Sequence, residues 1–332
     1  MSFKIDSEMH RRGTLKEARQ AALRILAEYE IEWSSIHFIQ LSEHITYRIA
    51  SETGEQFLLR IHPASKRYDE VLSELEWLSA LERASLNVPA GVLNRHGAFV
   101  TTTMGNDGSG MYGSVLRWVE GEGKEKGALS AEVIRDMGAM MATFHEASAH
   151  FRPSSRFVRP VWGLESLARD WEHVRRHRIH FISDEAIALY AAAVKKAAEQ
   201  LEGLNRHDRN YGMIHADLHL GNFVFRNDEP FAIDFGRCGF GYHLYDIAQA
   251  IMGLYPVQRT YFIEGYETVR ELDDDPIPAL ECFFIMAIIE AYSFHAENPL
   301  ETDNLIEEQP YAQAILRSFV NGKPFLFQPL EY

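Results

Sequence analysis

The sequence contains few cysteines and no long apolar run. Only Cys238 and Cys282 occur in 332 residues, too few for a disulfide framework or a thiolate metal site. The first residues, MSFKIDSEMHRRG, lack the apolar core of a signal peptide. The longest apolar run, Cys282 to Ile289, is too short to cross a bilayer before Glu290 interrupts it. These absences predict a cytoplasmic protein that does not associate with a membrane.

Basic residues are outnumbered by acidic ones. The chain has 33 Lys and Arg against 48 Asp and Glu, a formal net charge of −15, which argues against a nucleic-acid-binding surface. The excess of acid is compatible with an amine-bearing substrate, although an acidic surface that keeps the protein soluble is the favoured explanation. Hydrophobic residues make up 46% of the sequence, an ordinary value for a globular protein, and the length allows two cores. The sequence does not indicate an oligomeric state.

The hydrophobic pattern changes character near residue 120, which predicts an α+β protein of two lobes. Residues 1–30 are expected to form an N-terminal helical extension, with a helix over 14–29 that Thr14 caps. Residues 31–119 are expected to form a small, strand-rich, nucleotide-binding lobe with one helix over 69–83. The polar segment EGEGKEKG then opens a larger helical lobe, 120–332, with the catalytic loop and the acceptor site.

Individual elements follow from the same periodicities. The predicted strands cover 45–50, 57–61, 98–104 and 114–119. The predicted helices of the larger lobe begin after Ser130 and cover 184–203, 244–255, 258–271 and 279–296.

The most informative segment is MIHADLHLGNFVFRNDEPFAIDFG, residues 213–236. Two short apolar strands, Phe223–Phe225 and Phe231–Ile233, flank a turn and predict an antiparallel hairpin. Asn222 precedes the first strand and Asp234 follows the second, so the hairpin brings an amide oxygen and a carboxylate to one edge. Oxygen ligands in small number are what Mg²⁺ prefers in proteins, so we expect a metal site there.

Asp217 lies five residues before Asn222, on the loop that leads into the hairpin. From that loop it can accept or orient an attacking hydroxyl, and we predict it as the catalytic residue. Each residue alone is also explained as an ordinary turn former. Together, H-x-D-x-x-x-x-N followed by D-F-G matches the catalytic loop and the metal-binding Asp of protein kinases.

Other interpretations of this segment remain. His215 and His219 form an H-x-D-x-H pattern that a metallohydrolase could use, but no distant His/Asp cluster completes such a site and the hairpin is left unexplained. His215 is expected to orient the loop instead. Asp246 either caps a helix or holds the catalytic loop, and both roles are structural.

Phosphoryl transfer also needs positive charge at the nucleotide phosphates. In the strand FLLRI, Arg60 occupies the place of the strand lysine of protein kinases, and Glu74 lies beside the apolar stripe of the next helix, where it can pair with Arg60. An ordinary exposed ion pair is the alternative. Ser42, in a hairpin over 41–47, is predicted to contact the phosphates, and the backbone of Arg117 and Val119 is predicted to contact adenine.

A glycine-rich match, G-x-G-x-x-G at Gly108–Gly113, is a further candidate for phosphate binding. A dinucleotide fingerprint should open a helix within a βαβ unit, whereas this one opens the predicted strand 114–119. We therefore interpret it as a hairpin turn.

The sequence resembles the aminoglycoside phosphotransferase superfamily, also called the phosphotransferase enzyme family, over about residues 20–300. Within it, the sequence is most similar to the branch of stress-response kinase A-like proteins and type II homoserine kinases. The resemblance rests on the segments FLLRIHP, SELEWLSAL, LRWVEGE, MATFHEAS, IHADLHLGNFVF and AIDFGRCGFGYHLYDIA. It implies a protein kinase-like fold, ATP as co-substrate and Mg²⁺ as cofactor.

The resemblance also implies roles for individual residues. These are Asp217 as proton acceptor, Asn222 and Asp234 as magnesium ligands, and Arg60 with Glu74 near the phosphates. Two positions depart from the family pattern. Arg237 stands after Gly236 where relatives often carry an acidic residue, and His44-Ile45 stands where an Asn is common.

The acceptor is predicted to be a hydroxyl of a small metabolite. Only Arg237–Tyr245 separates the D-F-G segment from Asp246, whereas protein kinases place a long activation segment there. Glu290, inside the apolar helix 279–296, is a candidate for holding a substrate amine, with helix packing as the alternative. A Ser/Thr protein kinase of the stress-response type and a non-catalytic nucleotide-binding module remain the competing functions.

Overall fold

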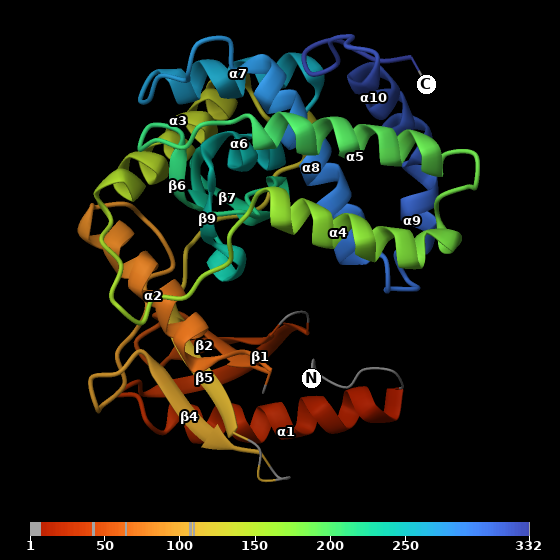
Figure 1. Cartoon of the computed structure of the whole chain (residues 1–332). Coiled ribbons are helices and arrows are strands. Elements are labelled where there is room, and N and C mark those ends of the chain that lie inside the picture. The colour runs from red at the N-terminus through yellow and green to blue at the C-terminus, as the bar shows by residue number, and fades with distance from the viewer. Residues whose placement is uncertain (1–7, 42–43, 64, 106–107, 109, 332) are drawn as a thin grey trace. The chain divides into compact units, whose positions relative to one another are not determined.

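The computed structural model describes residues 8–41, 44–63, 65–105, 108 and 110–331. It divides into two compact units (Figure 1). Unit 1 comprises the residues up to Glu120 together with Phe151–Arg159, and unit 2 comprises Gly121–His150 and Pro160–Tyr332. Unit 1 is built around a sheet and unit 2 mainly from helices, so the predicted α+β class is confirmed. The nucleotide-binding role of residues 31–119 and the catalytic and acceptor-binding roles of residues 120–332 stay predictions.

Unit 1 contains a five-stranded antiparallel sheet in the order β1-β2-β3-β5-β4. Its strands are β1 (Trp33–Leu41), β2 (Ile45–Ser51), β3 (Gln56–His62), β4 (Val100–Met104) and β5 (Gly110–Arg117). Four of them were predicted, while β1 was missed because its mostly exposed residues, WSSIHFIQL, show no regular alternation of apolar and polar side chains.

Helix α1 (Glu8–Leu26) packs on this sheet through one apolar stripe. Thr14 was predicted to cap the helix and this was wrong, because α1 already includes the helix-forming residues that precede it and Thr14 lies in its interior. Contact with β5 is so close that a side chain at Gly113 would meet Cδ1 of Ile25 at 2.3 Å. The G-x-G-x-x-G match opens no helix, as predicted, but its residues from Gly110 to Gly113 lie in strand β5 and not in the hairpin turn that was predicted for them.

Helix α2 (Tyr68–Arg83) carries the apolar stripe that its sequence predicts. Val71, Leu75 and Leu78 are buried, and Glu74 lies in the same stripe with only 2% of its side chain exposed. A buried carboxylate needs a partner, and Arg60 of β3 is the partner of Glu74.

Unit 2 is organised around helix α8 (Ile277–His295), which is apolar on nearly all sides. It packs against α4, α5, α6 and α10. By length and composition this helix could cross a membrane, but 67% of its most apolar window is buried inside the protein, as expected for a core helix. The other helices of the unit are α3 (Ala131–His150), α4 (Leu164–His177), α5 (Ile187–Glu202), α6 (His243–Met252), α7 (Pro256–Glu267), α9 (Thr302–Glu307) and α10 (Gln309–Val320).

Helices α3 and α7 cross at two glycines. A Cβ atom on Gly138 would lie 2.0 Å from the carbonyl oxygen of Phe262, and one on Gly265 would lie 1.9 Å from that of Arg135. The two backbones can therefore approach closely, which brings His145 of α3 next to Tyr266 of α7. Ser130 caps α3 through its hydroxyl, which accepts from the amide of Val133 at 3.2 Å.

Two short antiparallel ladders complete unit 2. Strands β6 (Tyr211–Ile214) and β9 (Gly239–Tyr242) form one ladder, and β7 (Phe223–Arg226) and β8 (Glu229–Ala232) form the other. The catalytic-loop segment runs from the end of β6 to the start of β7, so both ladders fix its ends. Sequence periodicity did not predict β6 and β9, which have only four residues each.

Candidate active site

The predicted hairpin is present and sets the geometry of the site. Strand β7 pairs with β8 in the register Phe223↔Ala232, around a tight turn in which Asn227 and Asp228 have φ of +51° and +68°. The ladder continues one step further, because the amide of Ile233 donates to the carbonyl oxygen of Asn222 at 3.0 Å. Asn222 and Asp234 therefore lie at the same end of the hairpin.

Asn222 also contacts Asp217. Its Nδ2 donates to the backbone oxygen of Asp217 at 2.7 Å and to the carboxylate Oδ2 of Asp217 at 3.2 Å. These bonds turn the nitrogen of the amide toward Asp217, so Oδ1 of Asn222 faces away from Asp217. Asp234 adopts the left-handed conformation, with φ of 61° and ψ of 64°, and Ala216 has φ of 60°. Such conformations are unfavourable for residues other than glycine and often occur at functional sites.

His215 links the catalytic loop to the hairpin. Its Nε2 donates to the carbonyl oxygen of Ile233 at 3.0 Å, one residue before Asp234. Burial lowers the pKa of His215, although the charge of Asp246 opposes the shift, so the ring is neutral at pH 7. This contact agrees with the expectation that His215 orients the loop.

Asp246 holds the other side of the loop. Its carboxylate, fully buried in the first turn of α6, accepts from the amide of His215 at 2.8 Å and from the amide of Ala216 at 2.6 Å. It is also 3.1 Å from Nε2 of His145. Burial raises the pKa of Asp246, and the neighbouring His215 and the amides oppose that shift. Of the two roles open to Asp246, the structure shows the one that fixes the loop.

His145 lies in the segment MATFHEAS, and the sequence predicted no role for it. Its Nδ1 is 2.8 Å from the hydroxyl of Tyr266, and its Nε2 faces Asp246. A neutral ring satisfies both contacts, because Nδ1 accepts from the tyrosine and Nε2 donates to the carboxylate. Burial, and then the charge of Arg270, lowers the pKa of His145 to about 3.

We expect the protein to lose stability below pH 6.5 in part through His145. An unfolded histidine takes up a proton near pH 6.5, whereas the folded one does so only near pH 3, so the unfolded chain binds the extra proton between these values. The contribution of His145 is complete above pH 6.5 and falls by about 1.4 kcal/mol per pH unit below it. Urea unfolding between pH 7.5 and 5 measures the slope.

The matched comparison for this prediction is His145→Gln against His180→Gln. The side chain of His180 is exposed, so its replacement should leave the pH slope unchanged, whereas His145→Gln should reduce it. Equal slopes in the two variants would contradict the assignment. Buried histidines that do not contact His145, such as His62, contribute equally to both proteins and cancel from the comparison.

Arg237, the departure from the family pattern, is paired with Glu290. The two side chains form an ion pair and are 13% and 10% exposed. The guanidinium also lies 4.9 Å from the ring centre of Trp162. Burial would lower the pKa of Arg237, but the charge of Glu290 and then that of Asp217 raises it above its usual value. Glu290 thus makes a packing contact, which was the alternative role given for it. Its contact with a substrate amine stays a prediction.

In unit 1, Arg60 of β3 and Glu74 of α2 form the ion pair that their positions predicted. Nη2 of Arg60 is 2.5 Å from Oε1 of Glu74, and each side chain is 2% exposed. Burial alone would raise the pKa of Glu74, but Arg60, followed by Arg159, lowers it. The Nε of Arg60 is buried without an acceptor among the described residues. The pair is therefore not an exposed one, and its nucleotide role stays a prediction.

The remaining nucleotide residues are less defined. Ser42 lies outside the described residues, although β1 and β2 pair as a hairpin up to Leu41 and Ile45. The amide of Arg117 donates to the carbonyl oxygen of Ala90 at 2.8 Å, so this N–H is not available to adenine. Val119 follows β5 in an irregular segment and stays a predicted contact.

A cavity of about 530 Å³ in unit 2 borders the catalytic loop. His219, Leu220 and Gly221 of that loop form one side. Helices α6, α8, α9 and α10 supply most of the rest: Gln249, Met252, Phe284, Ile288, Ala291, Tyr292, His295, Leu305, Tyr311, Ala312 and Ile315. Glu308, between α9 and α10, also lines the cavity. No sequence pattern singled out these residues, because they come from four helices that meet only in the folded chain.

The fold has clear counterparts among known proteins. The amicoumacin kinase of Bacillus subtilis (strain 168) is 22% identical over 321 residues, 92% of this chain and 93% of that protein. The solved structure of amicoumacin kinase hAmiN with AMP-PNP, Ca²⁺ and Ami has a TM-score of 0.78 at 19% identity, covering 96% of this chain and 98% of that one. A microcompartment-associated aminopropanol kinase has a TM-score of 0.77 at 24% identity, covering 92% and 98%.

These likenesses confirm the predicted two-lobed, kinase-like fold. The model of the phosphotransferase enzyme family matches residues 40–278, more than half of the chain. This range includes the catalytic loop, the hairpin and the pair of Arg60 with Glu74. The resemblance to the superfamily is thereby confirmed, and the chain belongs to the phosphotransferase enzyme family.

Proposed function

We propose that this protein transfers the γ-phosphoryl group of ATP to a hydroxyl of a small metabolite, in a reaction that depends on Mg²⁺. The observation that carries the proposal is the placement of three residues in unit 2. Asn222 is bonded to Asp217, and the hairpin pairs the backbone of Asn222 with Ile233, one residue before Asp234. Membership of a phosphotransferase family supports the reaction type.

The residues present fit a divalent ion and a nucleotide. The amide nitrogen of Asn222 is engaged by Asp217, so its Oδ1 is the atom left to act as a ligand together with the carboxylate of Asp234. The buried Nε of Arg60 has no acceptor among the described residues, as expected of a donor that binds a phosphate oxygen. Magnesium, when bound, would neutralise charge on the phosphates during transfer.

Asp217 has the role of accepting the proton of the acceptor hydroxyl. As the hydroxyl oxygen bonds to the γ-phosphorus, the bond to the β,γ-bridging oxygen breaks, and ADP leaves with those electrons. The hydroxyl proton passes to the carboxylate of Asp217. The two bonds from Nδ2 of Asn222 hold this aspartate in place, so that the carboxylate can orient the hydroxyl whose proton it takes.

The cavity beside His219–Gly221 is our candidate for the acceptor site. Its volume of about 530 Å³ suits a small molecule, and its lining is mainly apolar with a few polar groups, as is usual for such sites. One solved neighbour is an aminopropanol kinase, and this supports an amine-bearing acceptor. Glu308 lines the cavity and is a second candidate for the amine contact beside Glu290. A protein substrate is the less favoured alternative.

A metabolite screen tests the proposal directly. The purified protein is incubated with ATP, Mg²⁺ and pools of hydroxylated amines, sugars and amino acids, and ADP formation is measured. We expect one pool to raise ADP formation well above the rate without acceptor. Labelled phosphate on a generic protein substrate alone would favour the protein kinase, and ATP binding without any transfer would favour a binding module.

The pair of Arg60 with Glu74 allows a prediction that separates stability from nucleotide binding. Arg60→Met leaves the buried carboxylate of Glu74 without its partner and is expected to cost about 3–5 kcal/mol of folding free energy. The double variant Arg60→Met/Glu74→Met removes both charges and should regain most of that stability.

Nucleotide binding should not recover in the double variant. We expect its Kd for ATP, measured by calorimetry, to rise about tenfold or more, because one charge-assisted contact to phosphate is lost. Arg95→Met is the control, since Arg95 lies near Glu28 on the surface of the same unit. Wild-type affinity in the double variant would remove Arg60 from the nucleotide site.

A further inference from the structure

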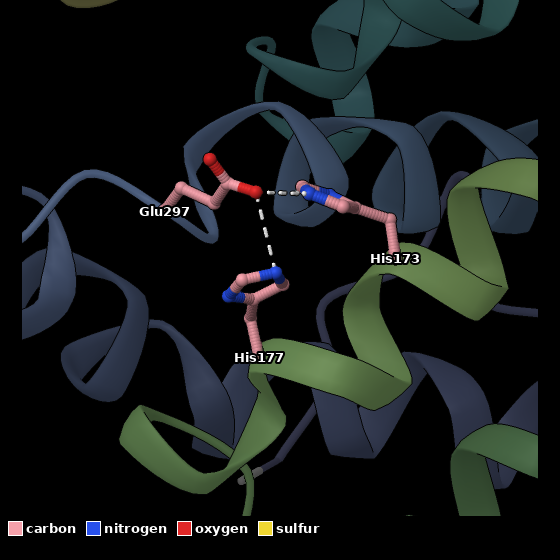
Figure 2. Close-up of side chains that lie close together, drawn as sticks. All are labelled: His173, His177 and Glu297. Atoms are coloured by element: carbon pink, nitrogen blue, oxygen red, sulfur yellow. Dashed lines mark hydrogen bonds and ion pairs between the residues drawn. The ribbon is translucent and has the colours of Figure 1, made fainter.

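A second cluster of ligand-type side chains lies in unit 2, and the phosphotransfer reaction does not use it. His173 and His177 are one turn apart at the end of α4, and Glu297 follows the end of α8 (Figure 2). Nε2 of His173 is 3.0 Å from Oε1 of Glu297, and Nε2 of His177 is 3.3 Å from the same oxygen. The three ligand atoms all lie within 4.8 Å of one another.

The protonation of His173 makes this contact unusual. Its Nδ1 is 3.0 Å from the carbonyl oxygen of Ser293, which can only accept, so the proton of the neutral ring is on Nδ1. The hydroxyl of Ser293, 3.3 Å from the same nitrogen, donates to Asp170. Nε2 of His173 therefore directs a lone pair at a carboxylate oxygen, and a second imidazole nitrogen approaches that oxygen. Either extra protons or a cation must lie between these atoms.

We propose that His173, His177 and Glu297 bind a divalent transition-metal ion, with zinc as the best fit. Two imidazoles and one carboxylate form a ligand set that zinc commonly takes, with a fourth position left for water. Ligand atoms about 2.0–2.1 Å from a tetrahedral ion are about 3.3 Å apart, close to the separations of 3.0 and 3.3 Å from Oε1.

Surrounding contacts prepare the three side chains for an ion. The carbonyl of Ser293 fixes the ring of His173, as backbone carbonyls do for histidines that bind zinc. Arg175 and Arg176 lie on the same helix but turn to Glu172, at 3.2 and 3.1 Å, so their charges are partly neutralised. The side chains of His173 and His177 are about one-third exposed, which leaves a path from solvent.

An ion at this place would join the ends of two helices. It would link α4 to the residue just beyond α8, and α8 supplies Ile288, Tyr292 and His295 to the cavity beside the catalytic loop. The bound ion would thus stabilise the helix end that borders the cavity. This effect does not require that the cavity binds the phosphate acceptor.

Metal binding is tested with the full chain after removal of metal by a chelator. The Asp234→Asn background is used, so that the proposed magnesium ligands do not contribute. We expect about one Zn²⁺ per chain by calorimetry and a rise in Tm of about 5 °C at saturating Zn²⁺, because an ion that binds only the folded state stabilises it. Co²⁺ should give the visible absorption of a tetrahedral site.

The variant His173→Ala/His177→Ala should bind Zn²⁺ at least about 100-fold more weakly and lose the rise in Tm. His180→Ala is the matched control, because His180 is an exposed histidine in the turn after α4. This variant should keep the wild-type affinity for Zn²⁺ and the rise in Tm. Glu297→Gln keeps the shape of the site and should weaken binding while the protein remains folded. Equal affinity in the double variant and in the control, or no Zn²⁺ bound at micromolar concentration, would overturn the proposal and leave a proton-stabilised cluster.

Discussion

Replacing Asp217 by Asn is expected to lower kcat/KM for the acceptor by about 10³-fold or more. Asparagine has nearly the same shape and can still accept from Nδ2 of Asn222, so the loop should keep its geometry. The variant loses only the carboxylate that takes the hydroxyl proton. Mg²⁺-dependent hydrolysis of ATP without acceptor should fall as well, and this can be measured before the acceptor is known.

Folding and nucleotide binding separate this loss from general damage. We expect the Tm of Asp217→Asn and its Kd for ATP to stay close to the wild-type values. Asp136→Asn, on the exposed face of α3, is the control and should retain full activity. Equal rates of ATP hydrolysis in wild type and Asp217→Asn would contradict the catalytic role and favour a nucleotide-binding module.

Replacing Asp246 by Ala is expected to cost about 3–5 kcal/mol of stability, or about 10 °C in Tm. The variant leaves the amides of His215 and Ala216 and the Nε2–H of His145 buried without an acceptor. It also releases Ala216 from its left-handed conformation, so Asp217 should lose its fixed position. We therefore expect kcat to fall together with stability.

The conservative variant Asp246→Asn tests the mechanism of that loss. Its one oxygen can accept from an amide of the loop, but its nitrogen would face another donor, so an intermediate loss of stability is expected. Asp184→Ala is the control, because Asp184 pairs with Arg178 on the surface, where such pairs contribute little. Thermal unfolding of all three variants makes the comparison. A change in Tm for Asp246→Ala no larger than that of the control would contradict the anchoring role.

Residues that depend on local patterns were predictable. Two short apolar strands around a turn predicted the β7–β8 hairpin, and the alternation of an antiparallel pair predicted that Asn222 and Asp234 share one end. Helical periodicity likewise placed Glu74 on the buried face of α2. Such arrangements involve residues that are near in sequence, or elements that follow each other directly. Their geometry is fixed by backbone regularity and requires no knowledge of distant packing.

Residues joined by distant packing were not predictable. Helix α4 escaped prediction because its sequence, LESLARDWEHVRRH, is mostly polar and buries only a narrow stripe. His145 meets Asp246 across 101 residues of sequence, and His173 meets Glu297 across 124. Arg237 and Glu290, 53 residues apart, form an ion pair that the sequence did not predict.

Local sequence patterns were enough to predict the reaction type. The types and spacing of Asp217, Asn222 and Asp234 predicted phosphoryl transfer. One loop and one hairpin are enough to place a predicted proton acceptor beside two predicted metal ligands. The surroundings of these three residues became visible only in the folded chain. Three features arise where helices far apart in the chain pack together. They are the cavity beside His219–Gly221, the anchoring of the loop by Asp246, and the cluster of His173, His177 and Glu297. The free energy of burying many side chains at once sets such packing, and no short segment of sequence encodes it.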